Sequence, residues 1–285
     1  MSRRFILIDG VCYEQALERL YMLDEELLIE PLYTNTPWQE VADLGPILLM
    51  PGNNSMLWEE VENGAMQHAA AILTSDAELS EVSMQLRQFN HLTDSQGNHC
   101  LLRYADPLVA WFWLGSFGAA ELGRVMGPVT HWRVVRPQAS WTRSQATEWQ
   151  EFAPPAPAKN CPADLLGSAQ VNALNLAYRW QLKNRIYEWL RIHHAAELQR
   201  KGGEDMDAWL EACLQRAETS GLLTERSTVI WCALDLCQEQ DFTLSEGTYQ
   251  QWLKEQAGLL PPTPDQRLQQ YYRFRMSATK GLSRT

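Results

Sequence analysis

The sequence predicts an α+β protein, with a mixed α/β sheet in the first half and an all-helical lobe in the second. Three observations predict this fold class. Before residue 152, short apolar runs of strand length occur among amphipathic segments of helical period. Four prolines between Pro154 and Pro162 then interrupt the chain. Beyond them, apolar residues recur at helical spacing almost to the C-terminus.

The predicted strands are short apolar runs bounded by turn residues. The first is 5–10, FILIDG, a continuous apolar run that stops at Asp9–Gly10, so we expect a buried strand ended by a turn. A hairpin is expected over 91–105, where two strand-like runs flank the turn residues 94–97. The other expected strands are 27–33, 46–50, 68–75 and 129–135.

Two amphipathic helices are expected over 13–23 and 76–89, and a third begins at Asp106–Pro107. The Asp106 carboxylate can cap free N–H groups, and proline at the first helical position gives up none that was bonded. Residues 108–114 are apolar on nearly every side, so this helix is expected to be buried or to meet a partner. Arg103 lies on a strand three residues before Asp106 and is expected to pair with it or with the preceding turn. We interpret Arg103 and Asp106 as a strand-to-helix corner rather than a catalytic pair.

The prolines divide the chain. We predict an α/β domain over 1–152, an extended, stiff linker over 153–164 and a helical lobe over 165–285. In the lobe, helices are expected over 171–193, 206–217, 227–237, 243–257 and, after three prolines, within 259–276. Cys213, Cys232 and Cys237 fall on apolar helical positions and are expected to be small core residues.

The charge is uneven along the chain. Residues 1–152 hold nine arginines, no lysine and 20 acidic residues, whereas 153–285 are balanced, so the net charge of −11 lies in the first half. An acidic surface repels nucleic acid and anionic membrane, and neither is expected as a partner. It would suit a basic protein partner, although an acidic surface kept for solubility explains the same pattern.

The composition is that of a globular protein, with 45% apolar and 21% charged residues. The apolar run near the N-terminus stops at Asp9 and does not read as a signal peptide, and the longest apolar stretch, 107–120, is too short to span a bilayer. We therefore expect free thiols in the cytoplasm. Twelve tryptophans are a large number, and they serve cores or binding interfaces.

The sequence contains no familiar catalytic signature. It lacks glycine-rich nucleotide loops, the nucleophile elbow G-x-S-x-G and the zinc motif H-E-x-x-H. The six histidines are dispersed and the six cysteines show no C-x-x-C spacing, so neither metal nor cofactor is expected. Runs such as Glu59, Glu60 and Glu62 are interpreted as solvated charge.

Three segments carry a resemblance to a known family. They are the strand ending at Asp9–Gly10, the R-Y-x-D-P run at 103–107, with Arg103, Asp106 and Pro107, and the turn Gly127–Pro128–Val129 before a final strand. In this order and spacing, from about Phe5 to Arg136, the first half resembles the type VI secretion effector-chaperone family (Tec, or type VI adaptor proteins, Tap). Leu108 stands where many relatives carry arginine.

The resemblance implies a cytoplasmic adaptor without catalytic activity. It would hold a toxic type VI effector and load it onto the VgrG spike or a PAAR-type tip. Our candidate partner-binding residues are the C-terminal aromatics Tyr271, Tyr272 and Phe274, followed by Trp141 and Trp149 near the linker. Two alternatives stay open: a hydrolase or transferase with an unrecognised carboxylate site, and a structural part of the secretion baseplate.

Overall fold

The computed structural model describes residues 2–23, 27–52, 54–93, 97, 99–142, 146–155, 165–202, 205–238, 242–243, 247–256, 258 and 263–282, without the side chains of 238 and 278–282. The chain forms two compact units, residues 1–138 with 144–178, and residues 139–143 with 179–285. The division falls inside helix α6 (Ser168–His193), whereas the sequence-based boundaries lie at 152 and 165. Most of the proline-rich linker, 156–164, lies outside the described residues.

The N-terminal unit contains a six-stranded sheet in the order β2-β3-β1-β4-β7-β8, and every pairing in it is antiparallel. Its strands are β1 (Arg3–Asp9), β2 (Leu28–Pro31), β3 (Pro46–Met50), β4 (Ala70–Ser75), β7 (Val129–Val135) and β8 (Trp149–Phe152). The first five match the predicted strands. The edge strand β8, with sequence WQEF, was not predicted, because its Gln–Glu centre interrupts any apolar run. The α+β fold class is confirmed.

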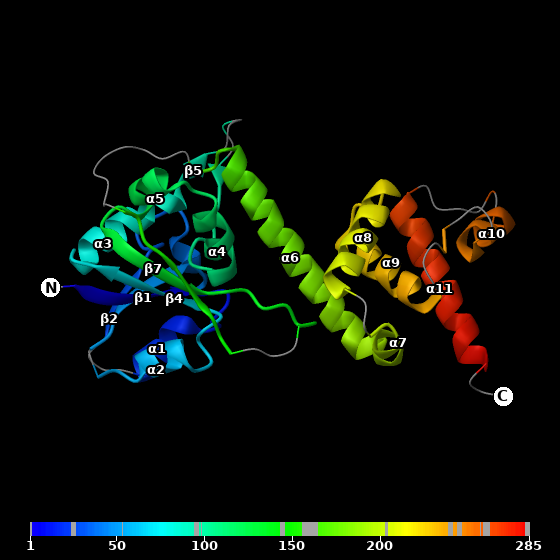
Figure 1. Cartoon of the computed structure of the whole chain (residues 1–285), viewed down its shortest axis with the longest axis horizontal. Helices are drawn as coiled ribbons and strands as arrows, with labels where there is room; N and C mark the ends of the chain where they lie inside the picture. Colours follow the sequence, from blue (N-terminus) through cyan, green and yellow to red (C-terminus); the bar gives the residue numbers. More distant parts are fainter. Residues whose placement is uncertain are drawn as a thin grey trace. The chain divides into compact units, whose positions relative to one another are not determined.

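Both faces of the sheet are covered, which explains why β1 is apolar without alternation. Phe5 and Leu7 lie in one buried cluster, and Ile6 and Ile8 lie in the other. Helices α1 (Ala16–Leu23) and α2 (Leu57–Glu62) cover the Ile6 face. The opposite face carries α3 (Leu79–Arg87), α4 (Pro107–Gly115) and α5 (Ala119–Met126), as Figure 1 shows.

Three helical elements of this unit were not predicted: α2, α5 and the 3-10 helix η1 (Gln39–Leu44). The glutamates interpreted as a charge run, Glu59, Glu60 and Glu62, belong to α2, whose Leu57 and Val61 are buried. The expected hairpin is present in short form, with β5 (Leu92–Thr93) paired antiparallel to β6 (His99–Cys100). A second 3-10 turn, η2 (Gln88–Asn90), follows α3.

The C-terminal unit is helical in its described residues. It contains the second part of α6 and the helices α7 (Ala195–Arg200), α8 (Met206–Thr219), α9 (Glu225–Gln238), α10 (Thr248–Glu255) and α11 (Pro264–Leu282). Cys213 and Cys232 are buried in its core, as predicted. The prediction for Cys237 is wrong, because this residue is exposed near the end of α9, with its Sγ 3.4 Å from Nδ1 of His194. No helix in the described part of the chain meets the length and hydropathy that a bilayer span requires.

Candidate partner-binding site

The end of β1 and the corner before α4 meet through a salt bridge between Arg103 and Asp9. Nη2 of Arg103 lies 2.7 Å from Oδ1 of Asp9 and 3.4 Å from Oδ2 of Asp106. The same Asp9 oxygen accepts hydrogen bonds from the backbone N–H groups of Val11 and Cys12, each at 3.0 Å. Asp9 therefore closes its own Asp–Gly turn and also holds the second motif.

Asp106 stands at the start of α4. Its Oδ1 accepts a hydrogen bond from the Leu108 N–H at 3.0 Å, and Pro107 occupies the first turn. The Asp106 backbone N–H donates to the carbonyl oxygen of Arg103 at 3.1 Å, which tightens the corner. Arg103 thus contacts Asp106, but its shorter contact is to Asp9, 94 residues earlier, a partner that local spacing could not reveal.

Burial dominates the electrostatics of this cluster. It raises the pKa of Asp106, against the opposing effect of the Arg103 cation. Burial, followed by the charges of Asp106 and Asp9, raises the pKa of the Cys12 thiol to about 12. Burial alone would lower the pKa of Arg103, but the hydrogen bond and charge of Asp9 raise it overall. At neutral pH, Cys12 is a neutral thiol and Arg103 a fixed cation.

The ligand atoms of Asp9, Cys12 and Asp106 all lie within 4.8 Å of one another, which is close enough for a metal site. However, the Arg103 guanidinium already lies against all three, with Nη2 3.4 Å from the Cys12 sulfur. A metal ion bound to these three ligand atoms would have to displace the guanidinium and would lie beside a fixed positive charge. The Arg103 guanidinium, rather than a metal ion, is therefore the cation that this cluster holds.

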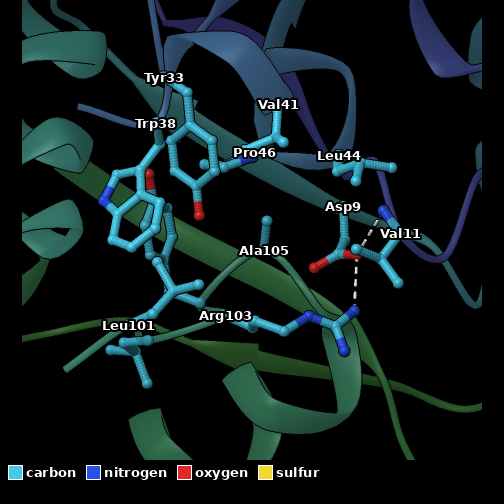
Figure 2. Close-up of a pocket in the computed structure, with 12 residues that line it drawn as sticks. Asp9, Val11, Tyr33, Trp38, Val41, Leu44, Pro46, Leu101, Arg103 and Ala105 are labelled. Atoms are coloured by element: carbon cyan, nitrogen blue, oxygen red, sulfur yellow. Dashed lines mark hydrogen bonds and ion pairs between the residues drawn. The ribbon is translucent and has the colours of Figure 1, made fainter. Parts of the chain in front are cut away.

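A pocket of about 230 Å³ opens beside this cluster and is lined by residues of both motifs (Figure 2). The ring of Tyr33 extends into it from one side, and Arg103 runs along the other side toward Asp9. Its rim is apolar and open to solvent: five lining side chains are between 39% and 49% exposed, namely Val11, Trp38, Val41, Leu44 and Leu101. Apolar side chains gathered at one opening are typical of a surface that meets a partner.

Two glycines allow the wall of the pocket to form. A Cβ on Gly10 would lie 2.1 Å from the backbone oxygen of Asp43, so η1 approaches this closely only because residue 10 has no side chain. The Gly10 N–H donates to the Gly45 carbonyl at 3.0 Å, and a Cβ on Gly45 would lie 2.4 Å from the Tyr33 ring. The glycine of the Asp–Gly motif thus positions η1, which supplies Val41 and Leu44.

None of the predicted partner-binding aromatics lines this pocket. Tyr271 is 1% exposed in the core of the C-terminal unit, with its hydroxyl 2.7 Å from Oγ1 of Thr248, so its side chain is not accessible to a partner in this structure. Tyr272 is half-buried, and Phe274 is 52% exposed. Trp141 packs on Tyr187, with ring centroids 5.7 Å apart, and Trp149 lies on β8 with the Arg133 guanidinium 5.3 Å from its ring.

The apolar rim of the pocket was not predicted from the sequence. Trp38, Val41 and Leu44 stand in a segment without clear period, and nothing local distinguishes them from loop residues. The local signal was Pro37–Trp38, an aromatic residue beside a turn-forming residue, between the predicted strands 27–33 and 46–50.

A larger hollow of about 610 Å³ lies in the same unit between α4, β8 and the first part of α6. It is lined by Trp111, Phe112, Phe152 and Leu176 among others, and by no residue of the Asp–Gly or R-Y-x-D-P motifs. We take the smaller pocket as the candidate site because both motifs build it.

Comparison with known proteins places the first half of the chain beside a known domain family. Residues 4–124 match the family model described as "Domain of unknown function (DUF4123)". Over 115 residues, 40% of this chain, the sequence is 25% identical to the accessory protein VasW of Vibrio cholerae serotype O1, and the match spans 38% of that protein's length. No solved structure matches. The family match covers less than half of this chain; within it, residues 4–124, which contain the Asp–Gly and R-Y-x-D-P motifs and the lining residues of the pocket, correspond to the DUF4123 domain, the family of Tec-type type VI effector chaperones.

Proposed function

We propose that this protein is a non-catalytic cytoplasmic chaperone that binds a type VI secretion effector and loads it onto the VgrG or PAAR spike. The family match and the accessory relative support a role of this accessory kind. The observation that carries the proposal is the pocket itself, because its apolar rim is exposed at the point where the two family motifs meet.

The polar groups next to the pocket favour binding over turnover. Asp9 is held by Arg103 and two backbone N–H groups, and Asp106 by Arg103 and the start of α4. The Cys12 thiol is protonated at neutral pH. A general base or nucleophile needs a lone pair that is free to reach a substrate. The oxygens of Asp9 and Asp106 instead accept hydrogen bonds and ion pairs within the strand-to-helix corner. The raised pKa of the buried Asp106 is the feature that a carboxylate enzyme would share, but Arg103 and the Leu108 N–H already hold this carboxylate, so we rank binding above catalysis.

The test is to isolate the tagged full-length protein from cells that express the secretion system and to analyse the eluate by mass spectrometry and light scattering. We expect one large effector in stoichiometric amount, with or without a spike protein. Deleting the gene should stop secretion of that effector and leave other effectors secreted. A protein recovered alone from such cells would refute the chaperone role, and recovery as a large self-assembly would favour the baseplate alternative.

A further inference from the structure

The size of the pocket beside Arg103 limits what it can hold. Small-molecule and cofactor sites usually measure roughly 300–1,000 Å³. An apolar cavity of about 150 Å³ is enough for one benzene ring. The pocket here measures about 230 Å³, so it fits one aromatic or branched aliphatic side chain rather than a cofactor.

The walls of the pocket select an apolar group. Trp38, Val41 and Leu101 present exposed apolar surface at the opening, and Tyr33, Pro46 and Leu102 line it further. Arg103 is the only cation among the described lining residues, and Asp9, the only acid among them, is paired with it. A charged side chain entering the pocket would lose its water and find no free counter-charge.

Two exposed acidic residues lie on η1 beside residues that line the opening. Glu40 and Asp43 lie on η1 next to the lining residues Val41 and Leu44, and both are exposed. Neither forms an ion pair with any residue that the structure describes. The surrounding domain adds to this field, since residues 1–152 carry the whole net charge of −11.

We infer that the pocket receives an apolar anchor side chain of the partner, carried on a segment with lysine or arginine next to the anchor, whose cations lie over Glu40 and Asp43. This inference rests on the proposed function. It adds which surface of this protein binds the partner and what chemistry the bound segment of the partner has. The apolar anchor supplies most of the affinity, and the flanking cations supply specificity and association rate. Pairing of this face with the same face of a second copy is disfavoured, because two acidic first halves repel one another.

The experiment selects peptides from a displayed library of random 12-residue sequences on the full-length protein and measures a selected synthetic peptide by titration calorimetry. We expect the selected sequences to share an aromatic or branched aliphatic residue beside Lys or Arg. Leu101→Glu, at a rim position 47% exposed, should weaken binding at least roughly tenfold by charging the opening.

A double charge reversal, Glu40→Lys with Asp43→Lys, should weaken binding roughly fivefold or more at low salt and less at high salt. The matched control reverses Asp76 and Glu121, two exposed acids that do not line the pocket, and should leave affinity within about twofold. Urea unfolding of each variant checks that the fold is kept.

Several outcomes overturn the inference: selected peptides without basic residues, no enrichment at all, or equal binding to Leu101→Glu. If Phe152→Glu lost binding and Leu101→Glu did not, the peptide-binding site would instead be the hollow between α4, β8 and α6. Co-purification of the effector with the same variants separates the two proposals. An effector retained by Leu101→Glu defeats this inference and leaves the chaperone role intact, whereas no effector with the wild type defeats the role itself.

Discussion

Asp9 and Arg103 lie 94 residues apart in the chain and form a salt bridge of 2.7 Å between Oδ1 and Nη2. Asp9 is 4% exposed, whereas the Arg103 side chain is 36% exposed. The pair therefore joins the interior of the N-terminal unit to one side of the pocket. It fixes the end of β1 against the corner that starts α4, and the pocket walls depend on this attachment.

Replacing Arg103 should destabilise the N-terminal unit strongly. Arg103→Ala leaves Asp9 and Asp106 buried with no cation, and removal of one partner from such a pair costs about 3 kcal/mol of unfolding free energy. Urea unfolding measures the change. The matched control is Arg136→Ala, since Arg136 and Glu148 form a pair with both side chains about 60% exposed, and its loss should cost less than about 1 kcal/mol. Equal effects in the two variants would contradict the structural role of Arg103.

Adding a methyl group at Gly10 should open the pocket. Gly10→Ala places a Cβ 2.1 Å from the Asp43 backbone oxygen, so η1 has to move, at a cost of about 3 kcal/mol. The variant should also lose peptide binding. Gly115→Ala is the control, because its Cβ would meet only the Phe152 ring at 3.9 Å inside helix α4, and alanine there should be neutral or stabilising by up to about 1 kcal/mol. The thermal unfolding midpoint of Gly10→Ala should fall, whereas that of Gly115→Ala should stay the same or rise.

The Cys12 thiol should make the fold sensitive to alkaline pH. Its pKa rises from 9.0 to about 12 in the folded protein, because of burial and the neighbouring carboxylates. Between these values the unfolded chain loses the proton and the folded chain keeps it, so stability is full below about pH 9 and falls as pH rises toward 12. Cys12→Ala should reduce this fall, by at most about 1 kcal/mol per pH unit after solvent screening. Unfolding free energies of the wild type and of Cys12→Ala at pH 7, 9 and 10 check this prediction. An equal loss of stability with pH in the two proteins would contradict the raised pKa of Cys12.

The C-terminal aromatics should divide into a core residue and a surface residue. Tyr271→Ala removes a fully buried ring and should cost about 3–5 kcal/mol. Phe274 is 52% exposed, so Phe274→Ala should cost less than about 1 kcal/mol. Only the second variant therefore tests an anchor: effector retention unchanged in Phe274→Ala would remove Phe274 from the candidate partner-binding residues. Circular dichroism during heating separates loss of the partner from loss of the fold.

The sequence by itself determined the elements whose signal is local. Five strands of the main sheet, the start of α4 at Asp106–Pro107 and the helical character of the second half follow from period, capping residues and proline positions. The order of three short motifs also indicated the family, and the family match over residues 4–124 includes the first two of them. Each of these signals lies within a few residues along the chain.

Only the tertiary structure decided the site. The pocket joins residues 9–11, 33–46 and 101–105, and the contacts between them depend on the antiparallel sheet and on the close approach of η1 to Gly10. Sequence period cannot report such contacts, because a long-range pairing is selected by the packing of the whole core rather than by neighbours in the chain. For the same reason Tyr271 and Phe274, three residues apart on one helix, differ in exposure: the core of the C-terminal unit covers one ring and leaves the other at the surface.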